Sequence, residues 1–145
     1  MDADSILNLE NQLCFAVYAA SHAFTKAYKP LLARLGLTYP QYLVMLVLWQ
    51  KRSATVSALG QALGLDSGTL SPLLKRLEKT GYVRRERSGE DERQVVVSLT
   101  PEGAAAREQA LEVMKTIGEA TGCSIEEMVN LRDRLNQVRR TLDEA

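Results

Sequence analysis

Two cysteines, Cys14 and Cys123, are the residues of this sequence whose side chains could carry redox chemistry. Their wide separation does not match the spacing of a metal site, and a single histidine, His22, is too little to complete one. The species that attacks a peroxide is the thiolate. The two thiols are therefore either redox-active groups or buried packing residues, as free cysteines often are.

The neighbours of the two cysteines in sequence rank them differently. The chain has no lysine or arginine before Lys26, so hydroxyl donors such as Tyr18 are the visible candidates for stabilising a thiolate at Cys14. Tyr18 lies four residues after Cys14, which places both on one face of a helix. Cys123 directly precedes a helix expected to start at Ser124, where the helix dipole favours an anion. From the residues alone, Cys123 is the more reactive candidate.

A second group of residues, on a segment that starts near Ser67, could bind nucleic acid. Leucines at positions 70, 73, 74 and 77 follow the spacing of one buried helix face, and Gly81 ends that helix. The rest of its surface carries small, hydrogen-bonding or cationic side chains: Gly68, Thr69, Ser71, Pro72, Lys75, Arg76 and Lys79. Short polar groups suit base edges in the major groove and cations suit phosphates. Residues 67–89 carry a net charge of +4, whereas the whole chain is neutral.

The elements that would position these side chains form a helix-turn-helix with a basic wing. A short amphipathic helix from about residue 55 ends at Gly64, and the leucine-bearing helix follows. Strands at 82–87, which carries Arg85 and Arg87, and at 94–100 would form the hairpin of the wing. Pro72 removes a helical hydrogen bond, so the second helix either starts near Thr69 or has an irregular first turn.

The remaining segments predict a mainly α fold with a small β wing. We expect a helix from about residue 5 to 28, with Cys14 in its middle and a break or kink at Pro30. Capping boxes at Thr38 and Ser124 predict two further helix starts, and Pro101 opens a long helix between them. Apolar stripes on the first and last helices favour a dimer, so residues 1–36 and 101–145 would form dimerisation regions around a DNA-binding lobe at 37–100, within one continuous structural domain.

Composition limits the cellular setting. The chain has 145 residues, of which 46% are hydrophobic and 25% charged, as in ordinary soluble globular proteins. No apolar run approaches the ~20 residues that a membrane helix needs. The first residues lack the basic and apolar regions of a signal peptide, so we expect a cytoplasmic protein without a membrane partner. We also expect no metal and no other cofactor.

Three stretches of this sequence resemble the MarR family of winged-helix repressors. They run from Leu65 to Ser71, from Leu77 to Val83, and from an Asp-x-Arg motif at 91–93 to Gly103. The resemblance implies a homodimer that binds pseudo-palindromic operator DNA. It also implies that Arg93, oriented by Asp91, enters the minor groove, where a narrow groove attracts arginine.

The stretch from Leu9 to Tyr18 resembles the organic-hydroperoxide-sensing (OhrR-type) branch of that family, in its two-cysteine subgroup. This resemblance implies that an organic hydroperoxide is the inducer, that Cys14 is the reactive thiol and that Cys123 resolves it; it thereby reverses the ranking made from the residues alone. It also implies that Tyr18, Tyr28 and Tyr39 hold the thiolate. Tyr28 lies ~21 Å along a straight helix from Cys14, so only a two-fold partner, paired about Ser21, could bring it to the thiol.

Two other functions fit parts of the sequence. A MarR-type repressor could instead respond to a small aromatic ligand, with cysteines that do not sense oxidants. A thiol peroxidase would also use a reactive cysteine, but it does not need a basic winged helix, and no peroxidase motif is present. We therefore expect a regulator and not an enzyme.

Overall fold

The computed structural model describes residues 2–89 and 94–145 and divides the chain into two compact units, residues 1–113 and 114–145. Each unit is described by itself. The boundaries expected after residues 36 and 100 both fall inside the first unit. Within the described residues, no helix is both long and apolar enough to span a membrane.

The N-terminal segment consists of two short helical segments followed by a long helix, and not of one helix from residue 5. They are α1 (Ala3–Ile6), the 3₁₀ helix η1 (Leu9–Asn11) and α2 (Leu13–Ala33). Asn8 and Gln12 adopt extended backbone conformations and separate these pieces. The amide of Gln12 donates hydrogen bonds to the carbonyl oxygens of Ile6, at 2.6 Å, and Asn8, at 3.0 Å. Side-chain bonds of this kind compete with a continuous helix and explain the break.

The sequence predicts a break or a kink at Pro30; helix α2 passes through this proline, so the helix does not break there. The residues that follow explain why the helix continues. Leu32 is fully buried, and Leu35 and Leu37 are nearly so. Burial of such side chains offsets the hydrogen bond that proline removes. The chain then turns at Gly36, whose φ is +72°.

Helix α3 (Tyr39–Lys51) begins with the capping box expected at Thr38. The hydroxyl of Thr38 accepts from the amide of Gln41, and the Gln41 side chain accepts from the amide of Thr38. Tyr42, Val44, Met45 and Leu48 of this helix are buried. Helix α3 therefore supplies the centre of the core in the first unit.

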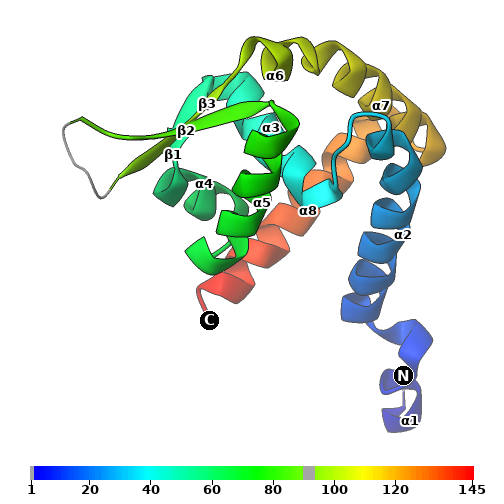
Figure 1. Cartoon of the computed structure of the whole chain (residues 1–145). Helices are drawn as coiled ribbons and strands as arrows, with labels where there is room; N and C mark the ends of the chain where they lie inside the picture. Colours follow the sequence, from blue (N-terminus) through cyan, green and yellow to red (C-terminus); the bar gives the residue numbers. More distant parts are fainter. Residues whose placement is uncertain (1, 90–93) are drawn as a thin grey trace. The chain divides into compact units, whose positions relative to one another are not determined.

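The helix-turn-helix is formed by α4 (Val56–Leu63) and α5 (Ser67–Thr80), as Figure 1 shows. Gly64 and Gly81 end the two helices with positive φ angles. Of the four leucines predicted on the apolar face of α5, Leu70, Leu74 and Leu77 are buried and Leu73 is half-buried.

Neither alternative for the start of α5 is correct, because the helix begins at Ser67 and continues regularly through Pro72. Pro72 is near the helix start, and its missing N–H would have bonded to the carbonyl of Gly68. Gly68 is exposed, so water can satisfy that carbonyl. The proline therefore costs little at this position.

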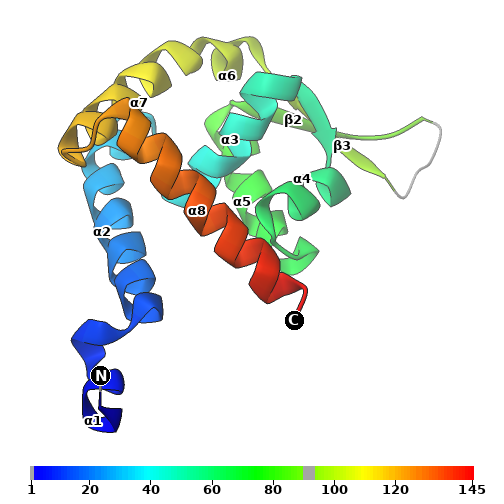
Figure 2. The ribbon, with the colours of Figure 1, turned by 180° about the vertical axis from the view of Figure 1, so that it is seen from behind.

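The sheet has three antiparallel strands in the order β1-β3-β2. Strands β2 (Val83–Arg87) and β3 (Val95–Leu99) form the predicted wing, with Arg85 opposite Val97. Strand β1 (Ser53–Thr55), which the sequence did not indicate, pairs with the other edge of β3. In Figures 1 and 2 the β2–β3 hairpin extends away from α4 and β1.

The helix expected to start at Pro101 is divided into α6 (Pro101–Ala105) and α7 (Arg107–Ala120). The indole Nε1 of Trp49 donates to the carbonyl oxygen of Gly103 at 2.8 Å. A continuous helix would use that carbonyl for the amide of Arg107, so the indole contact accounts for the break.

The last helix, α8 (Ile125–Asp143), lies in the second unit and has the expected capping box. The hydroxyl of Ser124 accepts from the amide of Glu127, and the Glu127 carboxylate accepts from the amide of Ser124. Gly122 precedes it with a φ of +70°.

Candidate DNA-binding surface and thiol sites

The predicted nucleic-acid-binding residues of α5 lie on its accessible surface. Ser71 is half-buried, and the others are exposed: Ser67, Gly68, Thr69, Pro72, Lys75, Arg76 and Lys79. The side chain of Asp66 accepts a hydrogen bond from the Thr69 amide at 2.7 Å and caps the helix. This backbone hydrogen bond lowers the pKa of Asp66 below its usual value. The cap fixes the first turn, which carries the short side chains suited to base edges.

The two basic residues predicted on strand β2 have different settings. Arg87 is exposed, whereas Arg85 is half-buried and faces α5. The guanidinium of Arg85 donates to the carboxylate of Glu78, with Nη2 at 3.1 Å and Nε at 3.3 Å from Oε1. These side-chain bonds, together with one from the Arg85 amide, lower the pKa of Glu78. Asp91 and Arg93, the predicted minor-groove pair, lie outside the described residues.

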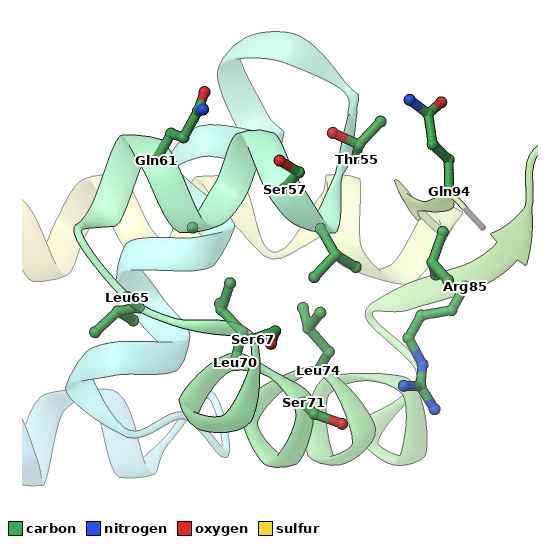
Figure 3. A pocket seen from close by; sticks show the side chains of 13 residues that line it. Thr55, Ser57, Gln61, Leu65, Ser67, Leu70, Ser71, Leu74, Arg85 and Gln94 are labelled. Carbon is green, nitrogen blue, oxygen red and sulfur yellow. The ribbon is translucent and has the colours of Figure 1, made fainter. Parts of the chain in front are cut away.

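A cavity of about 660 Å³ lies between α4, α5 and the wing. Figure 3 shows Leu70 and Leu74 of α5 pointing into the space below α4, while the side chain of Arg85 runs from β2 along one side of that space toward α5. Ser57 and Gln61 of α4 also line the cavity. The cavity has mainly apolar walls and one cation at its rim. Sequence patterns could not indicate it, because it depends on how three separate elements pack.

Cys14 is exposed and is the second residue of α2, so its expected place in the middle of a helix is wrong. Within the described residues, no side chain caps the N-terminus of α2. The first-turn amides at this end are a region of partial positive charge. The position therefore suits an anionic group.

Of the three predicted thiolate-binding tyrosines, only Tyr18 lies near Cys14 along the helix. Its ring is exposed and meets the ring of His22 edge-on, with centroids 4.5 Å apart. Tyr28 and Tyr39 lie together at the other end of α2, with ring centroids 5.0 Å apart. Within one chain, Tyr28 and Tyr39 therefore lie far from the thiol of Cys14.

A third tyrosine, Tyr42, completes the cluster of Tyr28 and Tyr39 and was missed from the sequence. Its ring centroid lies 5.4 Å from that of Tyr28 and 6.1 Å from that of Tyr39. Burial raises the pKa of all three hydroxyl groups, and Tyr28 also shares a side-chain hydrogen bond with Tyr42. The spacing of Tyr39 and Tyr42, three residues apart at the start of a helix, was the available signal.

Cys123 lies in the second unit, immediately before the cap of α8. It is half-buried, and its amide donates to the hydroxyl oxygen of Thr121 at 3.2 Å. Both cysteines are free thiols in this structure. Among the described residues, no cluster of three potential metal ligands is present.

Comparisons with known proteins identify the family. The family model of the SarA/Rot transcriptional regulators matches residues 26–109. The chain is also 48% identical to the organic hydroperoxide resistance transcriptional regulator of Bacillus subtilis, over 94% of this chain and 92% of that protein. This chain belongs to the MarR-like winged-helix transcriptional regulators.

Solved structures of MarR-like regulators agree with the fold. AbfR of Staphylococcus epidermidis superposes with a TM-score of 0.82 at 38% identity, covering 98% of both chains. Apo MarR of E. coli superposes with a TM-score of 0.70 at 25% identity, covering 88% of this chain and 96% of that one. The described helix-turn-helix and wing are thus the shared elements of a DNA-binding regulator.

Proposed function

We propose that this regulator is a homodimeric repressor that binds a pseudo-palindromic operator and releases it when an organic hydroperoxide oxidises Cys14. The observation that carries this proposal is the exposed thiol of Cys14 at the uncapped N-terminus of α2. A reactive cysteine needs access for the oxidant and a setting that accommodates the thiolate, and this position offers both. Operator binding would make it a cytoplasmic protein.

The accessible surface of α5 supports operator binding. Short side chains in its first turn would reach base edges, while Lys75 and Arg76 would neutralise phosphates. The hairpin beside α5 would carry Arg93 into the minor groove, with Asp91 as its orienting group. Two structures of AbfR, reduced and overoxidised, are bound to DNA.

The oxidation follows a balanced sequence. The thiolate of Cys14 attacks the terminal oxygen of the hydroperoxide, the O–O bond breaks, and the alkoxide leaves as an alcohol after taking up a proton. The sulfenic acid then condenses with the thiol of the partner subunit's Cys123, which releases water and forms a disulfide between the two chains. The Bacillus relative is named for organic hydroperoxide resistance, and a disulfide form of AbfR has been solved.

Dimerisation would complete the thiol site. Tyr28 lies too far along α2 to meet Cys14 of the same chain, since 14 residues of helix span ~21 Å. Tyr39, the first residue of α3, packs beside Tyr28. An antiparallel pairing of two α2 helices about Ser21 would bring these tyrosines to the partner's thiol. Exposed apolar residues along α2, including Phe15, Val17 and Phe24, are available for such a pairing.

The direct test is operator release by oxidant. A duplex selected from a random library by the reduced protein would serve as the operator. One equivalent of cumene hydroperoxide should abolish binding, and dithiothreitol should restore it, with mass spectrometry reporting the oxidised residue. Binding that persists while Cys14 is fully oxidised would exclude this function.

A second candidate is release by a small aromatic ligand, and the cavity beside α5 favours it. Its volume of about 660 Å³ is in the range of small-molecule sites. The guanidinium of Arg85 at its rim is bonded to Glu78 through Nε and Nη2, and its remaining N–H groups could donate to the carboxylate of a ligand. Release of the operator by an aromatic acid such as benzoate, from a variant without cysteines, would favour this candidate over oxidation.

A further inference from the structure

The contact between Arg85 and Glu78 joins the wing to helix α5 through three hydrogen bonds. Two are the side-chain bonds from Nε and Nη2 of Arg85 to Oε1 of Glu78. In the third, the backbone amide of Arg85 donates to Oε2 of the same carboxylate at 3.2 Å. A carboxylate of α5 thus binds both the side chain and the main chain of β2.

The hydrogen bond from the Arg85 amide to Glu78 lies at the free edge of the sheet. Strand β2 is at the edge of the sheet, since the order is β1-β3-β2. The amide of Arg85 therefore needs an acceptor outside the ladder, and Glu78 supplies one. The carboxylate takes the place of a neighbouring strand at this position.

The other basic residue near this point lacks such a setting. Arg84 is on the opposite face of β2, and its side chain is 66% exposed in a 3.8 Å contact with Glu86. The side chain of Arg85 is 27% exposed. Two nitrogens of its guanidinium donate to one carboxylate oxygen of Glu78, so the side chain is held by a charge-assisted contact.

We propose that Arg85 is a positioning residue, which with Glu78 fixes the spacing between the wing and α5, and that it is not a phosphate contact. This inference rests on the proposed operator binding. Helix and wing would address adjacent grooves of one duplex, so a fixed spacing lowers the ordering cost of binding.

The sign of one substitution separates the two roles. If Arg85 contacts a phosphate, Glu78→Gln frees its guanidinium and removes a negative charge near DNA, so binding should tighten. If the pair positions the wing, Glu78→Gln should weaken binding. Glu86→Gln is the matched control, because it removes one exposed carboxylate from the same strand region without touching Arg85.

The experiment measures binding of the full-length variants to a duplex selected from a random library by the wild type, over a range of salt. We expect Glu78→Gln and Arg85→Lys to weaken binding by about three- to tenfold, at the upper end of the effect of an exposed ion pair. The salt slope should stay that of the wild type. Lys75→Gln should lower the slope by about 1, as loss of a phosphate contact does.

Tighter binding by Glu78→Gln, or wild-type binding by Arg85→Lys, would overturn the proposal. Amide hydrogen exchange of residues 83–87 provides a readout without DNA: it should be at least about threefold faster in Glu78→Gln than in Glu86→Gln, because an edge hydrogen bond is lost. Equal exchange in the two variants would also overturn it. If the wild type selects no duplex, operator binding itself fails, while the exchange measurement still decides whether the contact holds the wing.

Discussion

The thiol of Cys14 lies at the start of a 21-residue helix, and Cys123 lies directly before the cap of another. The two helix starts differ in what already occupies them. At α8, the hydroxyl of Ser124 accepts from the amide of Glu127, and the carboxylate of Glu127 accepts from the amide of Ser124. Hydrogen bonding to the Ser124 amide lowers the pKa of Glu127, so a negative charge is already present there. The start of α2 has no such cap, and the thiol of Cys14 is exposed whereas Cys123 is half-buried. This difference in access favours Cys14 as the first thiol to react.

Replacing Tyr28 with phenylalanine tests the partner-built site. The change should slow the reaction of Cys14 with cumene hydroperoxide by about tenfold, the effect of losing one hydrogen bond to a charged group. Stopped-flow measurement of thiol loss would report the rate. Operator affinity should not change, and Tyr82→Phe, outside the thiol site, should react at the wild-type rate. A wild-type rate in Tyr28→Phe would contradict the trans arrangement.

The cluster of Tyr28, Tyr39 and Tyr42, of which Tyr42 is buried and the other two are half-buried, predicts a loss of stability in alkali. Burial raises the pKa of Tyr28, Tyr39 and Tyr42 above the value of about 10 that they have in the unfolded chain. Above pH 10 the unfolded state therefore releases protons that the folded state retains, and the free energy of unfolding falls as pH rises. Urea unfolding between pH 9 and pH 11 should show this fall. It should be shallower in Tyr28→Phe and unchanged in Tyr18→Phe, whose side chain is exposed; equal slopes in all three proteins would contradict the assignment.

At the scale of elements, the sequence predicts those features whose causes are local. The capping boxes at Thr38 and Ser124, the glycines that end α4 and α5, and the leucine face of α5 all depend on residues a few positions apart. Strand β1 could not be predicted, because three residues without alternation become a strand only by pairing with β3.

The same limit applies to the candidate site. The accessible residues of α5 follow from helical periodicity, whereas the contact of Arg85 with Glu78 joins a helix to a strand. The place of Cys14 within its helix depends on where α2 begins. The side chain of Gln12 donates to backbone carbonyl oxygens just before that point and favours a helix start there. Single-sequence patterns carry no information on such competing contacts.

The junction between the wing and α6 predicts a large effect of one methyl group. A Cβ at Gly103 would lie 2.0 Å from the carbonyl oxygen of Tyr82, a backbone atom that cannot move away easily. Gly103→Ala should therefore lower the free energy of unfolding by about 1–3 kcal/mol, the usual cost of overpacking. Gly118→Ala is the matched control in a helix, since its Cβ would meet only Met128 Cε at 3.9 Å. That variant should gain about 0.5–1 kcal/mol; urea unfolding of both would test the contrast, and an unaffected Gly103→Ala would contradict it.

At the level of the whole molecule, the proposed thiol site and operator binding both require a dimer. Leu131 and Leu135 of α8 are 56% and 39% exposed, which is unusual for one stripe of a helix unless a second chain covers it. We expect Leu131→Glu to raise the dimer dissociation constant at least tenfold, about 1.4 kcal/mol, because a charge would enter an apolar interface. Analytical ultracentrifugation would measure it. Gln137→Glu, on another face of α8, should remain dimeric, and a fully dimeric Leu131→Glu would exclude this stripe from the interface.

In the proposed mechanism oxidation of Cys14 causes operator release, and a comparison of two cysteine variants tests this step. Cys14→Ser and Cys123→Ser would each be titrated with the selected operator before and after one equivalent of cumene hydroperoxide. We predict that Cys14→Ser stays bound after treatment. We also predict that Cys123→Ser is released without forming the disulfide-linked dimer that we expect of the oxidised wild type on a non-reducing gel. Release of Cys14→Ser by the oxidant, with Cys123→Ser insensitive to it, would contradict the account and assign sensing to Cys123.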